Sequence, residues 1–355
     1  MIENPNAGIL FPEDIDHEQL LRDAGIADLA TLRGLPAERV QALKPKLDMA
    51  GGLPRLVQLE NLRGVFHNHT TASDGGAIGS LNADLTIINS RFTGNAATGT
   101  GGNPGDGGAG GALYMDGRDE ATSLCGVTIA DNTAGAIGGG VFRVSNDHTG
   151  RFAMDRTTVD HNAVTASGAG NAGGLYLEGL ALAISASTIS RNQAFYNGGL
   201  WINAGVAELT NVTIAGNVAT GSNGGGVWLG NAPTGTMRNC TIADNHATAD
   251  GQVAGAIFGA GLTLVNTIVA GNSAMYRPSC DGARADGAGN LQWPDGALCT
   301  TGPLIADPQL GALGDNGGPT ATMAPAASSP AAVTPALAKR CAWPRKPRRS
   351  SWPCT

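Results

Sequence analysis

The segment AELTNVTIAGNVA, residues 207–219, decides the fold because six other segments between residues 85 and 274 repeat its pattern. The copies align on an asparagine, with an apolar residue eight positions before it, another three positions before it, and alanine or valine two positions after it. The seven aligned asparagines are Asn95, Asn132, Asn162, Asn192, Asn217, Asn245 and Asn272. Self-similarity of this kind is the signature of a solenoid, in which each repeat stacks on the next.

A glycine-led apolar stretch precedes each asparagine segment, as in GGALYM from residue 110, GGLWIN from residue 198 and GGGVWLG from residue 224. Two solenoids fit the spacing. The asparagine segment matches the leucine-rich repeat consensus, but that fold returns along a leucine-rich, often helical side. Here the return path places valine, tryptophan, leucine, isoleucine or phenylalanine after glycine, which favours strands and disfavours helix. We therefore predict an all-β, right-handed parallel β-helix over residues 76–274, with three short strands per turn. A short helical segment is expected over residues 1–52.

In a parallel β-helix, equivalent side chains of successive turns stack about 4.8 Å apart. Ile214 and its equivalents are expected inside, and the asparagines are expected to form a hydrogen-bonded column at a bend. A buried asparagine without partners costs about 1–3 kcal/mol, so this column is interpreted as a structural ladder. One threonine per turn faces outward in the same pattern. These are Thr128, Thr158, Thr188, Thr213 and Thr241. The column could present hydroxyls to a glycan or an ordered surface, or it could reflect only the β propensity of threonine.

Composition and charge exclude several functions. The chain has 54 glycines and only 14% charged residues, which suits many short strands and tight turns. Residues 75–338 contain eighteen acidic side chains, nine basic ones and no lysine, which argues against nucleic-acid binding by the repeat. No apolar run approaches the roughly 18 residues of a membrane span, and residues 1–21 lack a signal-peptide pattern. We expect no membrane span and a monomer.

The best catalytic candidates in the repeat are Asp155, Asp160 and His161, with Arg156 and Arg191 in or beside the adjacent turn. Clustered acids beside arginine are the residues that a polysaccharide lyase or glycoside hydrolase uses. Charges on exposed turns are also common without any catalytic role, and we therefore favour a non-catalytic protein.

Two further pairs of residues are candidates for interaction, one inside the repeat region and one after it. Asp131 and Asp244 occupy the same repeat position, but four turns separate them by roughly 19 Å, too far for a catalytic pair. Cys280 and Cys299 could close one irregular loop as a disulfide. Free thiols in a reducing compartment are the alternative.

Residues 53–75, LPRLVQLENLRGVFHNHTTASDG, resemble the start of the PHP domain of bacterial family X DNA polymerases. Histidines two apart on a strand point the same way, and by this resemblance His67, His69 and Asp74 match ligands of a divalent metal. The later ligands of that family do not follow, because glycine-rich repeats begin at once. The resemblance implies a truncated, inactive fragment of a metal-dependent phosphoesterase or polymerase. Apart from this metal, no cofactor is expected.

Residues 75–330 resemble bacterial choice-of-anchor Q domain proteins, which are pectate-lyase-like β-helices. The most specific match is DPQLGALGDNGGPT, residues 307–320, within an anchor-type cap predicted over residues 275–330. The resemblance implies an exported, extracellular or surface-associated protein. The pattern is lost at Ala332, and residues 331–355 are predicted to be a disordered basic tail. Because the PHP-like start and the anchor-type solenoid are unusual neighbours, we hypothesise a chimeric reading frame.

Together these features predict a non-catalytic surface protein that binds a glycan or another surface, or acts in adhesion. A lyase or glycoside hydrolase on the β-helix is the first alternative, and a PHP-type phosphoesterase is the second.

Overall fold

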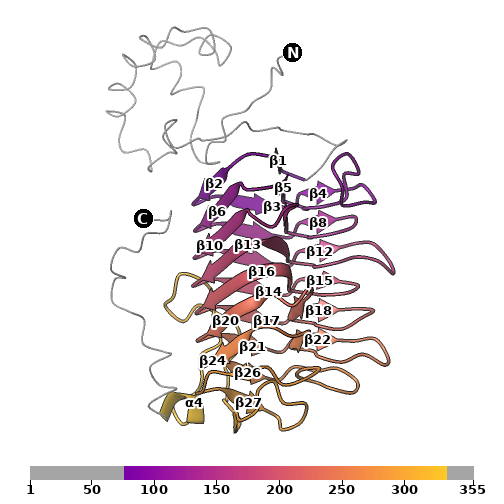
Figure 1. Ribbon diagram of the computed structural model, residues 1–355. Coiled ribbons are helices and arrows are strands. Elements are labelled where there is room, and N and C mark those ends of the chain that lie inside the picture. Colours follow the sequence, from indigo (N-terminus) through magenta and orange to yellow (C-terminus); the bar gives the residue numbers. More distant parts are fainter. Residues whose placement is uncertain (1–75, 334–355) are drawn as a thin grey trace, which may run out of the picture. The chain divides into compact units, whose positions relative to one another are not determined.

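The computed structural model describes residues 76–333, which form a parallel β-helix (Figure 1). The predicted all-β solenoid is confirmed. The predicted helical segment, the PHP-like stretch and most of the predicted tail lie outside the described residues.

Each of the first three turns contains four strands. They are β1 (Ile78–Leu81), β2 (Leu85–Ile88), β3 (Arg91–Thr93), β4 (Ala96–Ala97), β5 (Leu113–Gly117), β6 (Ala121–Cys125), β7 (Thr128–Ala130), β8 (Thr133–Ala134), β9 (Val141–Ser145), β10 (Arg151–Asp155), β11 (Thr158–Asp160) and β12 (Ala163–Val164). In the next two turns the first two strands merge. These turns contain β13 (Leu175–Ser185), β14 (Thr188–Ser190), β15 (Gln193–Ala194), β16 (Leu200–Thr210), β17 (Thr213–Ala215) and β18 (Val218–Ala219).

Later turns separate these strands again and then shorten. They contain β19 (Val227–Leu229), β20 (Thr234–Arg238), β21 (Thr241–Ala243), β22 (His246–Ala247), β23 (Ile257–Phe258), β24 (Thr263–Val265), β25 (Ile268–Ala270), β26 (Ala285–Asp286), β27 (Leu291–Trp293) and β28 (Leu304–Ile305), followed by helix α4 (Pro330–Val333). The expectation of three strands per turn therefore holds for the turns of β13–β15 and β16–β18, and for the shortened turn of β23–β25, whereas the other complete turns have four strands.

The strands form three parallel sheets. Sheet A has thirteen strands and contains the glycine-led strands and their successors, sheet B has nine strands from β3 to β28, and sheet C has six strands from β4 to β22. The eleven-residue strands β13 and β16 bend within sheet A, where the register shifts near Glu178. Gly205, at a φ of 103°, lies at this bend, a conformation that side chains other than glycine rarely adopt.

Single left-handed residues turn the chain from sheet B to sheet C. One such residue precedes each ladder asparagine, at Gly94, Asp131, His161, Arg191, Gly216, Asp244 and Gly271. Glycine and aspartate tolerate this backbone conformation better than most residues. The recurrence of Asp131 and Asp244 at one repeat position therefore has a backbone explanation.

The core lies inside the coil and is aliphatic, as the repeat predicts. Leu209 and Ile214 are completely buried, and so are most of their equivalents in other turns. Full burial of such a side chain stabilises the fold by about 1.5–3 kcal/mol. Close approach of the backbone also fixes one glycine per turn. At Gly198 an added Cβ would lie 2.3 Å from Val218 N and 2.7 Å from Gly225 O.

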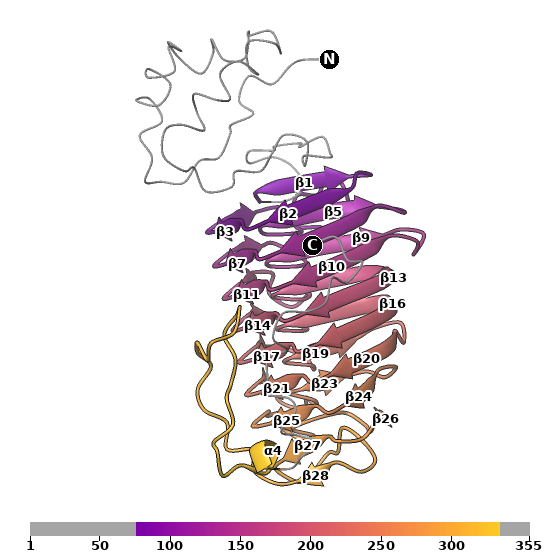
Figure 2. The same cartoon turned by 90° about the vertical axis from the view of Figure 1, so that its left-hand side faces the viewer.

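The C-terminal residues close the core and then cover part of sheet B. Cys280 and Cys299 form a disulfide, as the sequence suggests, with Cα atoms 5.2 Å apart. The chain then runs back along the outside of sheet B beside β14 and β17 (Figure 2). We call residues 307–323 of this return path the strap. Thr188 Oγ1 donates to Ala321 O, and Met323 packs on Ala215 and Ala243.

Candidate functional site

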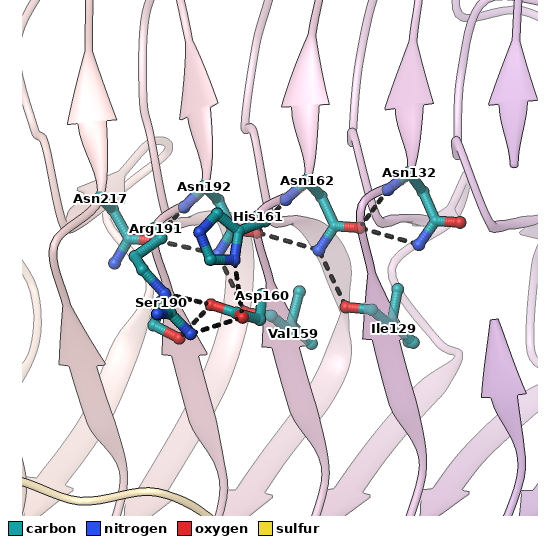
Figure 3. A network of polar contacts seen from close by, with 10 residues as sticks. All are labelled: Ile129, Asn132, Val159, Asp160, His161, Asn162, Ser190, Arg191, Asn192 and Asn217. Carbon is teal, nitrogen blue, oxygen red and sulfur yellow. Dashed lines mark hydrogen bonds and ion pairs between the residues drawn. The ribbon is translucent and has the colours of Figure 1, made fainter. Parts of the chain in front are cut away.

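The seven asparagines form a continuous hydrogen-bonded ladder, and Figure 3 shows four of them, Asn132, Asn162, Asn192 and Asn217. At its centre, Asn217 Nδ2 donates to Asn245 Oδ1 at 2.9 Å and to Ile189 O at 3.0 Å. The Oδ1 atom of Asn217 accepts from the main-chain N of Asn192 at 3.0 Å and from its Nδ2 at 2.9 Å. Because both donor hydrogens and the acceptor of each inner amide are used within the stack, the ladder is structural.

Asp160 is the centre of the polar network in Figure 3. Its carboxylate accepts from Ser190 Oγ at 2.7 Å, from Arg191 Nε at 2.9 Å and from Arg191 Nη2 at 2.7 Å, and it pairs with His161 Nδ1 at 2.8 Å. Burial opposes ionisation, but hydrogen bonds from Arg191, Ser190 and His161 outweigh it and lower the pKa of Asp160 below its ordinary value.

This network does not resemble a catalytic one. A carboxyl with a lowered pKa stays ionised and is a poor general acid. Ser190 donates to Asp160 and not to His161, so the serine lacks the contact with a base that activates a nucleophile. Arg191 neutralises the charge of Asp160. The simplest function of these contacts is to join two adjacent turns.

Asp155 belongs to a second network. Its carboxylate accepts from Ser185 Oγ at 2.7 Å and from Arg156 Nε at 2.7 Å. Its hydrogen-bond partners differ from those of Asp160, because Asp155 ends β10 in sheet A whereas Asp160 ends β11 in sheet B. The single cluster expected from the sequence is therefore two separate networks.

Asp131 and Asp244 are placed as the register requires. They follow β7 and β21, which are four strands apart in sheet B. A pocket of about 160 Å³ lies where Asp244 meets the strap, lined also by Trp293, Asp307 and Met323. Burial raises the pKa of Asp244 above its ordinary value, and the smaller effect of nearby His246 opposes this shift.

The threonine column is less open than its pattern predicts. The strap covers its centre, and Thr188 and Thr213 are buried. Thr128, Thr158 and Thr241 remain partly exposed. The expectation of a continuous column of solvent-facing hydroxyls is therefore wrong, because the chain covers its own sheet.

A column of aromatic side chains runs along the outside of sheet A through six consecutive turns. Its members are Tyr114, Phe142, Tyr176, Trp201, Trp228 and Phe258, each paired in register with the next. Successive ring centroids lie 5.2, 5.4, 5.8, 4.7 and 4.3 Å apart. Tyr114 and Phe142 are buried, whereas the other four rings are half-buried. The solvent-facing part of the column therefore begins at Tyr176.

Polar and aromatic side chains border this half-buried part. On one side, Tyr196 meets Trp228 edge to face, with centroids 6.4 Å apart. On the other side lies Glu178, which accepts from Asn203 Nδ2 at 2.7 Å and contacts His148 Nδ1 at 3.1 Å. We call Tyr176, Trp201, Trp228 and Phe258, with Tyr196, Glu178, Asn203 and the exposed Asn231, the aromatic face.

Burial and the adjacent Glu178 carboxylate raise the pKa of Tyr176 to about 12. Its phenol therefore stays protonated near neutral pH and can donate a hydrogen bond. The face combines flat apolar rings with a hydroxyl, amides and a carboxylate in one strip.

Sequence reasoning missed this column, although its signal was present. An aromatic residue stands two positions after the last glycine or alanine of each glycine-led stretch, at Tyr114, Phe142, Tyr176, Trp201, Trp228 and Phe258. Taken one at a time, these aromatics indicate only strands. The stacking rule that predicts the asparagine ladder also predicts an aromatic ladder.

The metal ligands suggested by the PHP resemblance, His67, His69 and Asp74, lie outside the described residues and stay a prediction. Within residues 76–333, no group of three or more His, Cys, Asp or Glu side chains is arranged to hold a metal ion. In the same range no helix is long and apolar enough to cross a membrane.

Comparison with known proteins gave no match to a family model, to a curated protein or to a solved structure.

Proposed function

We propose that this protein is a non-catalytic β-helix that binds glycans along its aromatic face and acts outside the cytoplasm. The observation that carries the proposal is the half-buried aromatic column in register over four turns, with hydrogen-bonding groups on its border. A sugar ring has apolar C–H surfaces beside hydroxyls. Binding sites for such molecules combine apolar and aromatic side chains with a few placed polar groups.

The regular geometry favours a polymer over a single sugar. Equivalent groups recur about every 4.8 Å along the stack, so successive units of an extended chain would meet similar side chains. Multiple weak contacts then add through effective concentration. The rigid ladder and core hold the rings in place, which limits the entropy lost on binding.

Two further observations support export. Cys280 and Cys299 are joined in a disulfide, and such bonds persist mainly in oxidising compartments. The resemblance of residues 75–330 to anchor-type surface proteins implies the same location.

Calorimetric titration with soluble oligosaccharides of increasing length tests the proposal. We expect affinity to rise with length over the first few sugar units. Asn203→Ala, which removes a polar group of the face, should weaken binding about three- to tenfold, in line with about 1 kcal/mol for one hydrogen bond. Thr158→Ala on sheet B is the matched control and should bind like wild type. Equal loss in both variants, or no binding of any oligosaccharide, would reject the proposal.

A second candidate function, glycoside hydrolysis, is favoured by the pocket at Asp244. There a carboxyl with a raised pKa and a second carboxyl, Asp307, share a pocket with the indole of Trp293. A protonated acid and a second carboxylate are the groups that glycosidases use. Release of reducing ends from the same oligosaccharides, lost in Asp244→Asn, would establish this activity. Intact oligosaccharides after long incubation would exclude it for those substrates.

A further inference from the structure

The charge of the aromatic face differs from that of a surface suited to acidic polysaccharides. Its ionisable border residue is Glu178, whose carboxylate lies beside Tyr176 and interacts with it electrostatically. The described partners of Glu178 are the amide of Asn203 and the imidazole of His148, so neither lysine nor arginine within residues 76–333 pairs with it.

Asp116 stands in the same position relative to Tyr114 as Glu178 does to Tyr176. It accepts from the Tyr114 hydroxyl at 3.1 Å and from Asn146 Nδ2. Arg143 is close enough to interact with Asp116, but it is 2% exposed and donates to main-chain carbonyls of Val144 and Glu120. The guanidinium is therefore unavailable to a ligand, whereas the Glu178 carboxylate, whose side chain is 12% exposed, borders the aromatic face.

The surrounding charge acts in the same direction. Residues 75–338 carry twice as many acidic as basic side chains, eighteen against nine, and no lysine. A surface of this sign raises the local concentration of cations and lowers that of anions. Aromatic rings also attract cations through their π faces, most strongly when tryptophan is involved.

From this arrangement we infer that the aromatic face selects glycans with protonated amino groups over neutral glycans, and neutral glycans over polyuronates. The inference rests on the proposed glycan binding and adds the class of ligand. Glu178 would pair with an ammonium group, while Trp201 and Trp228 contact the sugar rings.

Three hexasaccharides represent the amine-bearing, neutral and acidic classes of glycan. They are the hexamers of glucosamine, N-acetylglucosamine and galacturonic acid. The first two share one backbone and differ in whether the 2-amino group is acetylated, and therefore in charge at a pH low enough to protonate the free amines. In titrations at low ionic strength, we expect the glucosamine hexamer to bind more tightly than its acetylated counterpart by about two- to fivefold for each ammonium–carboxylate pair. The galacturonate hexamer should bind most weakly. The preference should shrink as salt is added.

Glu178→Gln identifies the residue responsible. It should bring the ratio of the two affinities, glucosamine hexamer to acetylated hexamer, to near unity, because only the glucosamine hexamer loses an ammonium–carboxylate pair. Glu208→Gln changes the net charge equally, but Glu208 lies on a different part of sheet A, where it accepts from Thr236 Oγ1. This control should keep the preference.

The outcomes are distinct. Binding of the acetylated hexamer without preference for the amine, or tighter binding of galacturonate, overturns the inference and leaves glycan binding intact. A preference that Glu178→Gln does not change also overturns it, because the selectivity then comes from elsewhere. Failure of all three hexamers to bind would count against the proposed function itself.

Discussion

Asn217 is a buried ladder asparagine whose side-chain amide uses both of its donor hydrogens and its acceptor oxygen. Replacing it by alanine removes two donated bonds and leaves the N and Nδ2 atoms of Asn192 without their acceptor. Since an unsatisfied buried group costs about 1–3 kcal/mol, we expect Asn217→Ala to lower the free energy of unfolding by about 3 kcal/mol. Denaturant unfolding measures this loss. The exposed residue Asn231, when changed to alanine, should alter stability by less than about 0.5 kcal/mol. Similar small losses in both variants would mean that the ladder does not stabilise the fold.

Gly198 lies where the main chains of adjacent turns approach too closely for any side chain. In Gly198→Ala the new Cβ would clash with main-chain atoms of Val218 and Gly225, whereas an added Cβ at Gly282 has no neighbour within 4 Å. Overpacking of a tight site typically costs about 1–3 kcal/mol. Thermal unfolding should therefore show a clear loss for Gly198→Ala and almost none for Gly282→Ala. A wild-type transition in Gly198→Ala would show that the turns can move apart.

The ionisation of Asp160 should make the stability of the fold depend on pH. Its folded-state pKa is lower than its unfolded-state pKa. Its contribution to stability is therefore present above the ordinary aspartate pKa of about 4 and is lost as pH falls through the folded-state value. We expect Asp160→Asn to have a lower Tm than wild type near pH 7 and the difference to shrink towards about pH 3. A constant difference across this range would contradict the assigned charge state.

Among the elements, the C-terminal closure is held by the Cys280–Cys299 disulfide, with a sequence separation of 19. By chain entropy, a loop of this size contributes about 3 kcal/mol. Because solenoid turns interact mainly with their neighbours, the loss in a Cys280→Ser, Cys299→Ser variant should be local. Hydrogen exchange should accelerate in β26–β28 and stay slow in β14–β17. Uniform acceleration throughout the turns would instead indicate one cooperative unit.

Some elements could be predicted from sequence and others could not. The strand around Ile214 and the bend at Asn217 repeat in seven copies, so their stacking follows from periodicity alone. The merging of two strands in β13 and β16 does not, because it depends on a bulge near Glu178 that only these turns contain. The strap also escapes periodicity, since it joins Thr188 to Ala321, 133 residues apart. That long-range contact is why the threonine column is covered.

At the scale of the whole β-helix, the sheets differ in what they offer to a partner. The strap covers part of sheet B, and the ladder borders sheet C with amides that are already satisfied. Sheet A presents the half-buried rings and Glu178. Charged residues alone, such as Asp160, do not identify a catalytic site. Charged residues also occur at the left-handed bends before the ladder asparagines and in the hydrogen bonds that join adjacent turns. The aromatic face is distinguished by side chains that neither corner nor core requires.

The indole N–H signals of Trp201 and Trp228 in a ¹H–¹⁵N spectrum provide the most direct test that glycans bind this face. On addition of a bound hexasaccharide, we expect both signals to shift with saturation, because the indoles lie in the aromatic face, and the signal of Trp293 to stay unchanged. Assignment by single Trp→Phe substitutions identifies each signal. A saturating shift of Trp293 alone, or no shift of Trp201 and Trp228, would contradict the account.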